Sequence, residues 1–229
     1  MTLPGRSHVG ALLLLLLLLG GCATVPFERT ELVPAPQRSA AQLAAGLWSA
    51  GKERLLIRQS ALFELQGMRV PIAGMMRLDL GAKQARLVGM NDMGVKLYDI
   101  SVDADSSRTQ FVVPELARYP GFAEAVAVSV RRIFLVPEPA PGDLLELLPK
   151  SYLLTRQAGA GAQLSFTLGG AEAQLLEKSC RGPAESWRVR YYLYQRREGL
   201  LFPGGIVLDD DQAGYRLTLW IESVEKTDE

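Results

Sequence analysis

Apolar and polar residues alternate along most of this chain, and this period of two constrains the fold more than any other feature. In the segment 53–66, Leu55, Ile57 and Phe63 fall on one side and Arg58 falls on the other. Such alternation is typical of a β-strand with one buried face. The pattern recurs in ten further segments, namely 70–80, 83–89, 95–102, 108–113, 152–157, 163–168, 173–180, 185–195, 205–209 and 215–224.

The connections between these segments predict an antiparallel arrangement. Most of them are short and contain Gly, Asn or Asp, as in Gly81-Ala82 and in the run 91–94. Such residues favour tight hairpin turns. There is no internal repeat and no second domain boundary, so we expect residues 39–229 to form one domain.

Three segments predict helices. Ser39 is a suitable N-cap for a helix over 39–48, Pro114 precedes a mostly apolar helical region at 115–135, and Asp143 could cap a short helix through Leu148. The expected fold class is mainly β (α+β). It is a strongly curved antiparallel sheet, or half-barrel, of about eleven strands, with helices covering the concave face.

A curved sheet covered by helices can enclose an apolar cavity. The inward positions of the strands supply candidate lining residues, which are Phe63, Met76, Leu78, Phe111, Phe166, Val189 and Leu219. A filled apolar core would show the same periodicity, so both readings stay open at this point.

The beginning of the chain carries an export signal. Arg6 precedes an unbroken apolar run at 11–19, and two glycines and Cys22 follow it. A basic start, an apolar core of about 7–15 residues and a small-residue cleavage zone define a secretory signal peptide. We therefore expect residues 1–21 to be removed and residues 22–38 to form a flexible tether.

The cleavage zone, Leu19-Gly20-Gly21-Cys22, resembles the lipobox of bacterial lipoproteins. In that family the cysteine is acylated and becomes the new N-terminus. The resemblance implies that Cys22 is lipidated and holds the protein on a membrane, with an ordinary signal peptide as the alternative. The residue after it is alanine and not aspartate, which implies the outer membrane of a Gram-negative host.

Charge and histidine content exclude several functions. The chain has 25 basic and 25 acidic residues, and its one histidine, His8, lies in the leader. The absence of a basic excess argues against nucleic acid as a partner. Without histidine, Ser-His and Cys-His nucleophile pairs and histidine metal sites are excluded. Besides Cys22 the mature chain has one thiol, Cys180, which we expect to be buried and inert.

The remaining motifs predict no catalytic residue, no metal and no cofactor, and so a protein that is not an enzyme. The run 209–211 is three aspartates, but an EF-hand calcium loop also needs oxygen ligands where Ala213 and Trp220 stand. A solvated hairpin turn is favoured there. The Gly pairs are not followed by Gly-Lys-Ser/Thr, so we expect no phosphate-binding loop.

An N-terminal helix, a five-strand meander, a helical insertion and a closing set of strands together resemble the lipoprotein carriers LolA and LolB, and LolB most of all. The hairpin 86–97 resembles the LolB hairpin with its Pro-Leu-Gly turn. Trp187-Arg188-Val189, the run 202–208 and the last strand resemble further LolB segments. The chain is also similar to uncharacterised lipoproteins associated with aryl polyene synthesis.

This resemblance implies a non-enzymatic lipoprotein at the periplasmic face of the outer membrane. Its partners would be the membrane, an acyl chain or lipoprotein cargo, and a periplasmic protein. Met93 matches the LolB turn leucine that inserts into membranes, the alternative being a plain hairpin turn. A second hypothesis is a scaffold that docks an enzyme through a basic-aromatic strand face, formed by Arg188, Arg190, Tyr191, Tyr192, Tyr194, Arg196 and Arg197.

Overall fold

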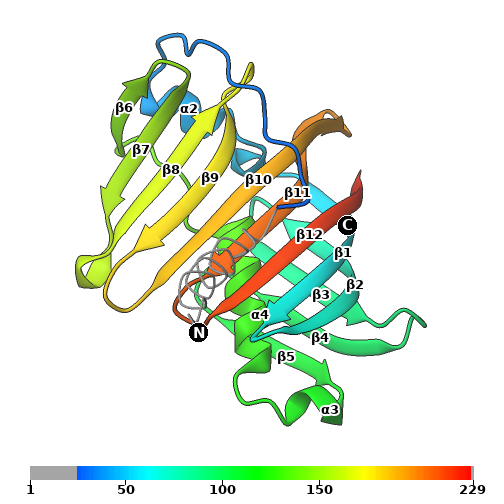
Figure 1. The fold of residues 1–229 in the computed structure, drawn as a ribbon. Coiled ribbons are helices and arrows are strands. Elements are labelled where there is room, and N and C mark those ends of the chain that lie inside the picture. Colours follow the sequence, from blue (N-terminus) through cyan, green and yellow to red (C-terminus); the bar gives the residue numbers. More distant parts are fainter. Residues whose placement is uncertain (1–24, 228–229) are drawn as a thin grey trace, which may run out of the picture.

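The computed structural model describes residues 25–227 and contains one curved, twelve-stranded antiparallel sheet (Figure 1). The strands are β1 (Arg54–Leu65), β2 (Met68–Asp79), β3 (Gln84–Met90), β4 (Lys96–Val102), β5 (Ser107–Val112), β6 (Leu144–Leu148), β7 (Ser151–Gln157), β8 (Gln163–Gly169), β9 (Gln174–Arg181), β10 (Ser186–Arg197), β11 (Leu200–Asp210) and β12 (Tyr215–Lys226). The predicted half-barrel is confirmed.

The strand order is β5-β4-β3-β2-β1-β12-β11-β10-β9-β8-β7-β6. Two meanders are thus joined where the first strand pairs with the last, from Leu55 opposite Lys226 to Leu65 opposite Tyr215. Strands β5 and β6 form the two edges although they follow each other in the chain. The connection between them must therefore cross the sheet from edge to edge, and it carries three of the six helical elements in the described residues.

Tight turns account for the long hairpins. At Gln66-Gly67 and at Glu198-Gly199 both residues have positive φ angles, between +49° and +84°. Two consecutive residues with positive φ make a type I′ turn, whose twist matches that of the flanking strands. The paired strands β1–β2 and β10–β11 can therefore run for eleven or twelve residues each without splaying.

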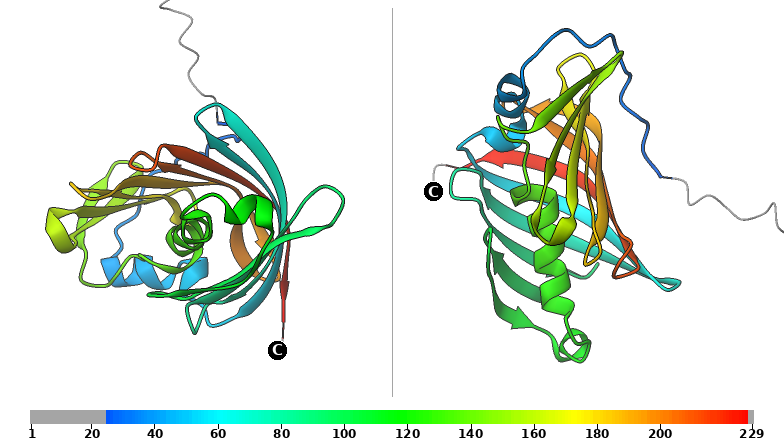
Figure 2. Two further views of the ribbon diagram at one scale, coloured as in Figure 1. Left: turned by 90° about the horizontal axis from the view of Figure 1, so that it is seen from below. Right: turned by 90° about the vertical axis from the view of Figure 1, so that its left-hand side faces the viewer.

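The helices lie on the concave side of the sheet (Figure 2). They are α2 (Ala40–Ala45), η1 (Trp48–Ala50), α3 (Pro114–Ala117), α4 (Phe122–Val130) and the π-helical turn η2 (Arg131–Leu135); η3 (Gly159–Gly161) is a short turn between β7 and β8. The predicted cap is confirmed, because Ser39 and Gln42 form a reciprocal capping box at the start of α2. No helix in the described part of the chain is both long and apolar enough to cross a bilayer.

The expected helix at 143–148 is wrong, since these residues form the edge strand β6 and raise the strand number to twelve. Asp143 does not cap a helix; its carboxylate accepts hydrogen bonds from Arg156 and from the backbone N–H of Ala140. The sequence Leu-Leu-Glu-Leu-Leu has no period of two, and pairing with β7 decides its conformation. This is a long-range effect that local propensity does not contain.

The segment 25–38, expected as a flexible tether, lies against the sheet from Phe27 onward; we call it the strap. Phe27 is buried on the outer, convex face, where its ring lies 5.5 Å from that of Tyr192 and 5.6 Å from that of Trp220. Further along, the Tyr152 hydroxyl donates to the carbonyl of Pro36. The predicted signal peptide and the proposed lipidation site Cys22 lie outside the described residues.

Candidate functional site

The concave face of the sheet is the candidate binding surface, and most of the predicted lining residues meet there. Met76, Leu78, Phe166, Val189 and Leu219 are buried in one apolar cluster, and the half-buried Phe63 packs against it. They come from both meanders, so the curvature of the sheet brings together residues that are far apart in the sequence.

Phe111 is the exception, because it lies on the outer face. Its side chain is 39% exposed and the Lys96 ammonium lies 4.9 Å from the centre of its ring. The pairing of β4 with β5 shifts by one residue between Asp99 and Ile100. Beyond such a bulge, simple alternation assigns side chains to the wrong face.

The helical insertion fills the concave face. Its buried apolar side chains are Ala127, Val130, Ile133, Phe134 and Leu135. Trp48 of η1 closes the same space from the other end of the sheet. Its ring centre lies 4.7 Å from that of Phe202 and 6.3 Å from that of Phe134. A ligand could therefore enter this space only where these side chains move.

A small number of polar contacts hold α4 and η2 on the sheet. The Tyr191 hydroxyl donates to the carbonyl of Ile133 at 2.7 Å, and the hydroxyls of Ser129 and Tyr215 lie 2.8 Å apart. Burial raises the pKa of both tyrosines, so both phenols stay protonated at neutral pH. Arg132 makes an ion pair with Asp210 at 2.6 Å.

The aspartate run 209–211 is used within the protein. Asp209 pairs with Arg190 and Arg216, while Asp210 pairs with Arg132. The backbone N–H of Ala213 donates to Asp210, as in a hairpin turn. Within residues 25–227 no cluster of carboxylate, thiol or imidazole groups is arranged to hold a metal ion.

A buried lysine, which the sequence analysis missed, lies on the concave side. Lys178 of β9 is 3% exposed, and its ammonium donates to the carbonyl of Pro137 at 3.2 Å. Burial lowers its pKa to about 7, against the opposing effect of the Glu138 carboxylate. Glu138 also makes an ion pair with Lys83 at 2.7 Å. The segment after η2 thus contacts charged groups from both meanders.

A hollow of about 200 Å³ opens at the rim of the half-barrel, where the loop after α2 meets the ends of β9, β10 and β11. Leu47, Trp48, Leu175, Tyr194 and Leu200 give it an apolar floor. An ion pair between Glu172 and Arg196 lies at its edge. This hollow adjoins the filled concave space, because Trp48 belongs to both.

The β3–β4 hairpin presents apolar side chains at its tip. Met93 is 83% exposed and Val95 is 53% exposed. The Asn91 side chain accepts from the backbone N–H groups of both residues, at 3.0 Å and 2.9 Å, and Gly94 has a φ of +77°. The turn is therefore fixed by Asn91 and Gly94, and Met93 projects from it.

The basic-aromatic residues of β10 do not share one face. Tyr191 points inward and Tyr192 lies outward under the strap, as alternation requires. Leu193 has a φ of +52° and is exposed, and after it Tyr194 points inward, its hydroxyl donating to the carbonyl of Leu175. The expected continuation of the alternation through Leu193 is wrong, because its left-handed backbone conformation reverses the alternation while the pairing of β10 with β11 keeps one register.

The predicted state of Cys180 is confirmed. The thiol is fully buried on β9, and burial raises its pKa to about 11. It therefore stays protonated at neutral pH and is a poor nucleophile.

Comparison with known proteins finds the fold but no close relative. No known family profile matches the chain, and no curated protein matches it. A LolA-superfamily protein from Nitrosomonas europaea superimposes with a TM-score of 0.55 at 8% identity, covering 84% of this chain and 96% of that one.

Two further solved structures are similar. A putative outer-membrane lipoprotein-sorting protein domain from Vibrio parahaemolyticus has a TM-score of 0.53 at 8% identity, covering 82% of this chain and 90% of that one. A DUF1329 family protein from Desulfovibrio piger has a TM-score of 0.54 at 8% identity, covering 82% and 92%. The chain therefore has a LolA-type fold, and at this identity the likeness concerns the fold alone.

Proposed function

We propose that this protein is a lipid-anchored carrier that binds or relays acyl chains at the periplasmic face of the outer membrane. The cargo would be a lipid, a lipoprotein or a polyene-type lipid. The observation that carries the proposal is the concave apolar face, which is covered by an insertion and not by further strands. The LolA-type fold and the lipobox-like sequence before Cys22 support it.

The energetics of cargo binding follow from the filled concave face. Burying an acyl chain gains about 0.8 kcal/mol per CH₂ group. Against this stands the cost of moving the insertion, whose apolar residues must find other contacts or meet water. Because η2 is a π-helical turn, in which the N–H of Val136 bonds to the carbonyl of Arg131, the insertion already departs from regular helix there.

Met93 is proposed to contact the membrane during cargo release. It is apolar and flexible, and it projects from a turn whose shape does not depend on it. Cys22, when acylated, would keep the hairpin near the membrane surface. Binding and release are thereby assigned to different parts of the molecule.

Uptake of a fluorescent fatty acid by the chain carrying Cys22→Ser tests the proposal. We expect saturable binding at micromolar ligand. Met93→Glu should slow transfer from the protein to vesicles at least about tenfold while leaving binding within about twofold, because a charge at the tip opposes insertion. Gln212→Glu adds the same charge to another exposed turn and serves as the control. Absence of uptake at micromolar ligand would falsify the carrier proposal.

The second candidate function is a non-catalytic scaffold that docks a periplasmic or membrane enzyme. The filled concave face favours it, because a protein with no ligand space can still present its outer surface. Capture of one defined protein by the anchored chain, together with no fatty-acid uptake, would select the scaffold. Uptake that saturates at one site per chain would select the carrier.

A further inference from the structure

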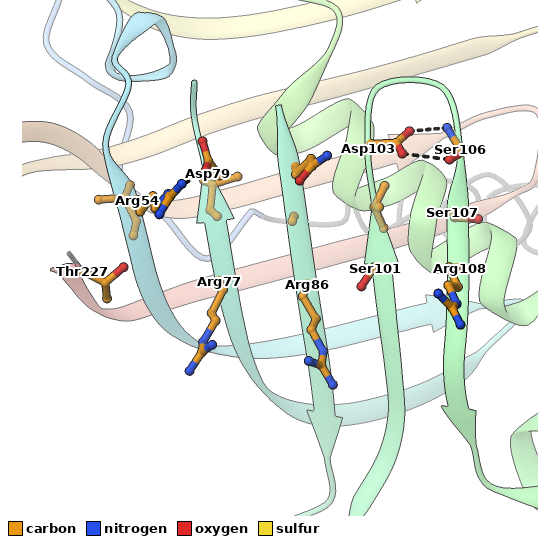
Figure 3. A pocket seen from close by; sticks show the side chains of 15 residues that line it. Arg54, Arg77, Asp79, Arg86, Ser101, Asp103, Ser106, Ser107, Arg108 and Thr227 are labelled. Atoms are coloured by element: carbon orange, nitrogen blue, oxygen red, sulfur yellow. Dashed lines mark hydrogen bonds and ion pairs between the residues drawn. The ribbon is translucent and has the colours of Figure 1, made fainter. Parts of the chain in front are cut away.

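The outer face of β2–β5 carries a row of three arginines and one serine, which we call the arginine row: Arg77, Arg86, Ser101 and Arg108. Strand pairing places Arg77 opposite Arg86, Arg86 opposite Ser101, and Ser101 opposite Arg108. Neighbouring strands lie about 5 Å apart, so the row spans about 15 Å. Figure 3 shows its side chains directed to the same side of the sheet.

The row lies in a hollow of about 340 Å³ at the outer surface. Two aspartates share this hollow, and both are already engaged. Asp79 accepts from the backbone N–H of Ala82 and makes an ion pair with Arg54. Asp103 accepts from the hydroxyl and the backbone N–H of Ser106. These contacts lower the pKa of both carboxyl groups, so they stay ionised and committed to their partners.

The positive charge of the arginine row is only partly compensated. Asp99 forms a two-pronged pair with Arg86, both contacts at 2.8 Å, and also lies 3.7 Å from Lys96. Arg77 and Arg108 have no ion-pair partner among residues 25–227. Like charges directly opposite each other on neighbouring strands are destabilising. An anion seated between Arg77 and Arg86 would relieve that repulsion.

The donors of the row suit a phosphoryl group. Guanidinium groups keep their charge at all accessible pH values, and their fork geometry matches phosphate oxygens. The hydroxyl oxygen of Ser101 accepts from the Gln110 amide at 3.0 Å, so its own hydrogen is free to donate to an anion. The row thus offers the two unpaired guanidiniums, this hydroxyl and the N–H groups of Arg86 that Asp99 does not use. Together they line a surface wider than a single carboxylate needs.

The next row on the same face is largely apolar. Met75 lies opposite Val88, and Phe111 lies opposite Asp99. Met75 is 37% exposed, and Phe111 carries the Lys96 ammonium over its ring. Phosphate-binding cations beside exposed apolar side chains match the boundary between lipid headgroup and acyl chain.

We propose that the arginine row is a binding site for phosphoryl groups, in the first place the headgroup phosphates of anionic lipids. This site is on the opposite face of the sheet from the space assigned to acyl chains. It does not rest on that assignment, and fatty-acid uptake should be unchanged when the row is altered.

Two probes distinguish a phosphoryl group on a lipid headgroup from one on a soluble compound. The chain carrying Cys22→Ser is titrated with inorganic phosphate, and separately sedimented with phosphatidylcholine vesicles that do or do not contain phosphatidylglycerol. We expect binding to the vesicles that contain phosphatidylglycerol, and weaker binding of inorganic phosphate. Arg77→Gln/Arg108→Gln should weaken vesicle binding about tenfold or more.

Arg118→Gln/Arg181→Gln is the matched control, because both of its arginines are exposed and lie outside the row. We expect it to bind within about twofold of the unaltered chain, with thermal unfolding showing that both double variants are folded. Binding of inorganic phosphate without vesicle binding, lost in the row variant alone, would support the site and assign it to soluble phosphoryl compounds. Equal losses in both double variants, or binding of neither probe, would overturn the proposal.

Discussion

Lys178 shows how a single residue can make the stability of this protein depend on pH. The residue lies between β8 and β10, where Phe166 and Val189 are its strand neighbours, and its ammonium is buried on the concave side of the sheet. Burial lowers its pKa to about 7, whereas in the unfolded chain the group keeps its ordinary value of 10.5. Between these two values the unfolded chain holds a proton that the folded protein lacks.

Stability should therefore rise with pH above about 7, by up to about 1.4 kcal/mol per pH unit. Urea unfolding at about pH 7 and about pH 8.5 measures the rise, and this window avoids Cys180, which titrates at 9.0 when unfolded. Lys178→Met should remove the rise and Lys150→Met, at an exposed position, should keep it. The interpretation is wrong if all three chains show the same pH dependence.

Bulges decide for which residues strand alternation predicts the correct face of the sheet. In β9 the register shifts opposite Thr167 and Leu168, so that Leu175 and Lys178 both point inward. Strict alternation from Leu175 would have put Lys178 outside. Met93, by contrast, lies in the turn that the run 91–94 predicted, so its place in a turn followed from the local sequence, whereas its exposure of 83% did not. Strand alternation therefore predicted the direction of a side chain correctly only where no bulge lay between it and the reference residue.

Among the elements, the strap packs against the sheet at a point where one residue must be glycine. A Cβ on Gly205 would lie 2.7 Å from the ring of Phe27, so only glycine at this point of β11 leaves room for the ring. Phe27 is five positions after Cys22, a span of at most about 18 Å when extended. If Cys22 is acylated, docking of the strap would keep this outer face close to the membrane.

Release of the strap can be tested from either side of the contact. Phe27→Ala and Gly205→Ala should both expose Trp220, which is half-buried beside the ring, shift tryptophan emission to the red and open residues 25–36 to protease. Glu28→Ala, at an exposed neighbouring position, should do neither. A strap that stays protected in both variants would show that Phe27 does not hold it.

The helical elements were easier to predict than the edge strand. Ser39 with Gln42, and Pro114 before an apolar run, are signals contained within a few residues. The edge strand β6 depends on pairing with β7, and the strap depends on Phe27 meeting Tyr192 and Trp220. Both are set by contacts between distant segments, which single-sequence patterns do not record.

For the whole molecule, the period of two and the turn residues were enough to predict a curved antiparallel sheet. They could not predict that β1 pairs with β12, or that the space inside is filled by Phe134 and Trp48. Overall composition also concealed the arginine row, because a chain with equal numbers of acids and bases can still concentrate charge on one face.

The filled concave face leads to one prediction about the molecule as a whole, which is that cargo binding requires the insertion to move. Ser107 of β5 and Glu124 of α4 are in contact, their side-chain oxygens lying 3.2 Å apart. Ser107→Cys/Glu124→Cys in the chain carrying Cys22→Ser, joined by a short bis-maleimide whose two arms each add one thiol, would hold the helix on the sheet. Fatty-acid uptake should then be at least about tenfold slower, since the ligand cannot displace the buried side chains.

The control joins two strands of the sheet and leaves the helix free. Ser60 and Glu222 are hydrogen-bonded neighbours on β1 and β12, so Ser60→Cys/Glu222→Cys accepts the same reagent without restraining α4. This chain should take up ligand at the unaltered rate, as should the helix pair before cross-linking. Undiminished uptake by the cross-linked helix pair would place the ligand elsewhere, with the rim hollow around Trp48 as the next site to alter. Loss of uptake in that pair alone would identify the insertion as the gate of the carrier.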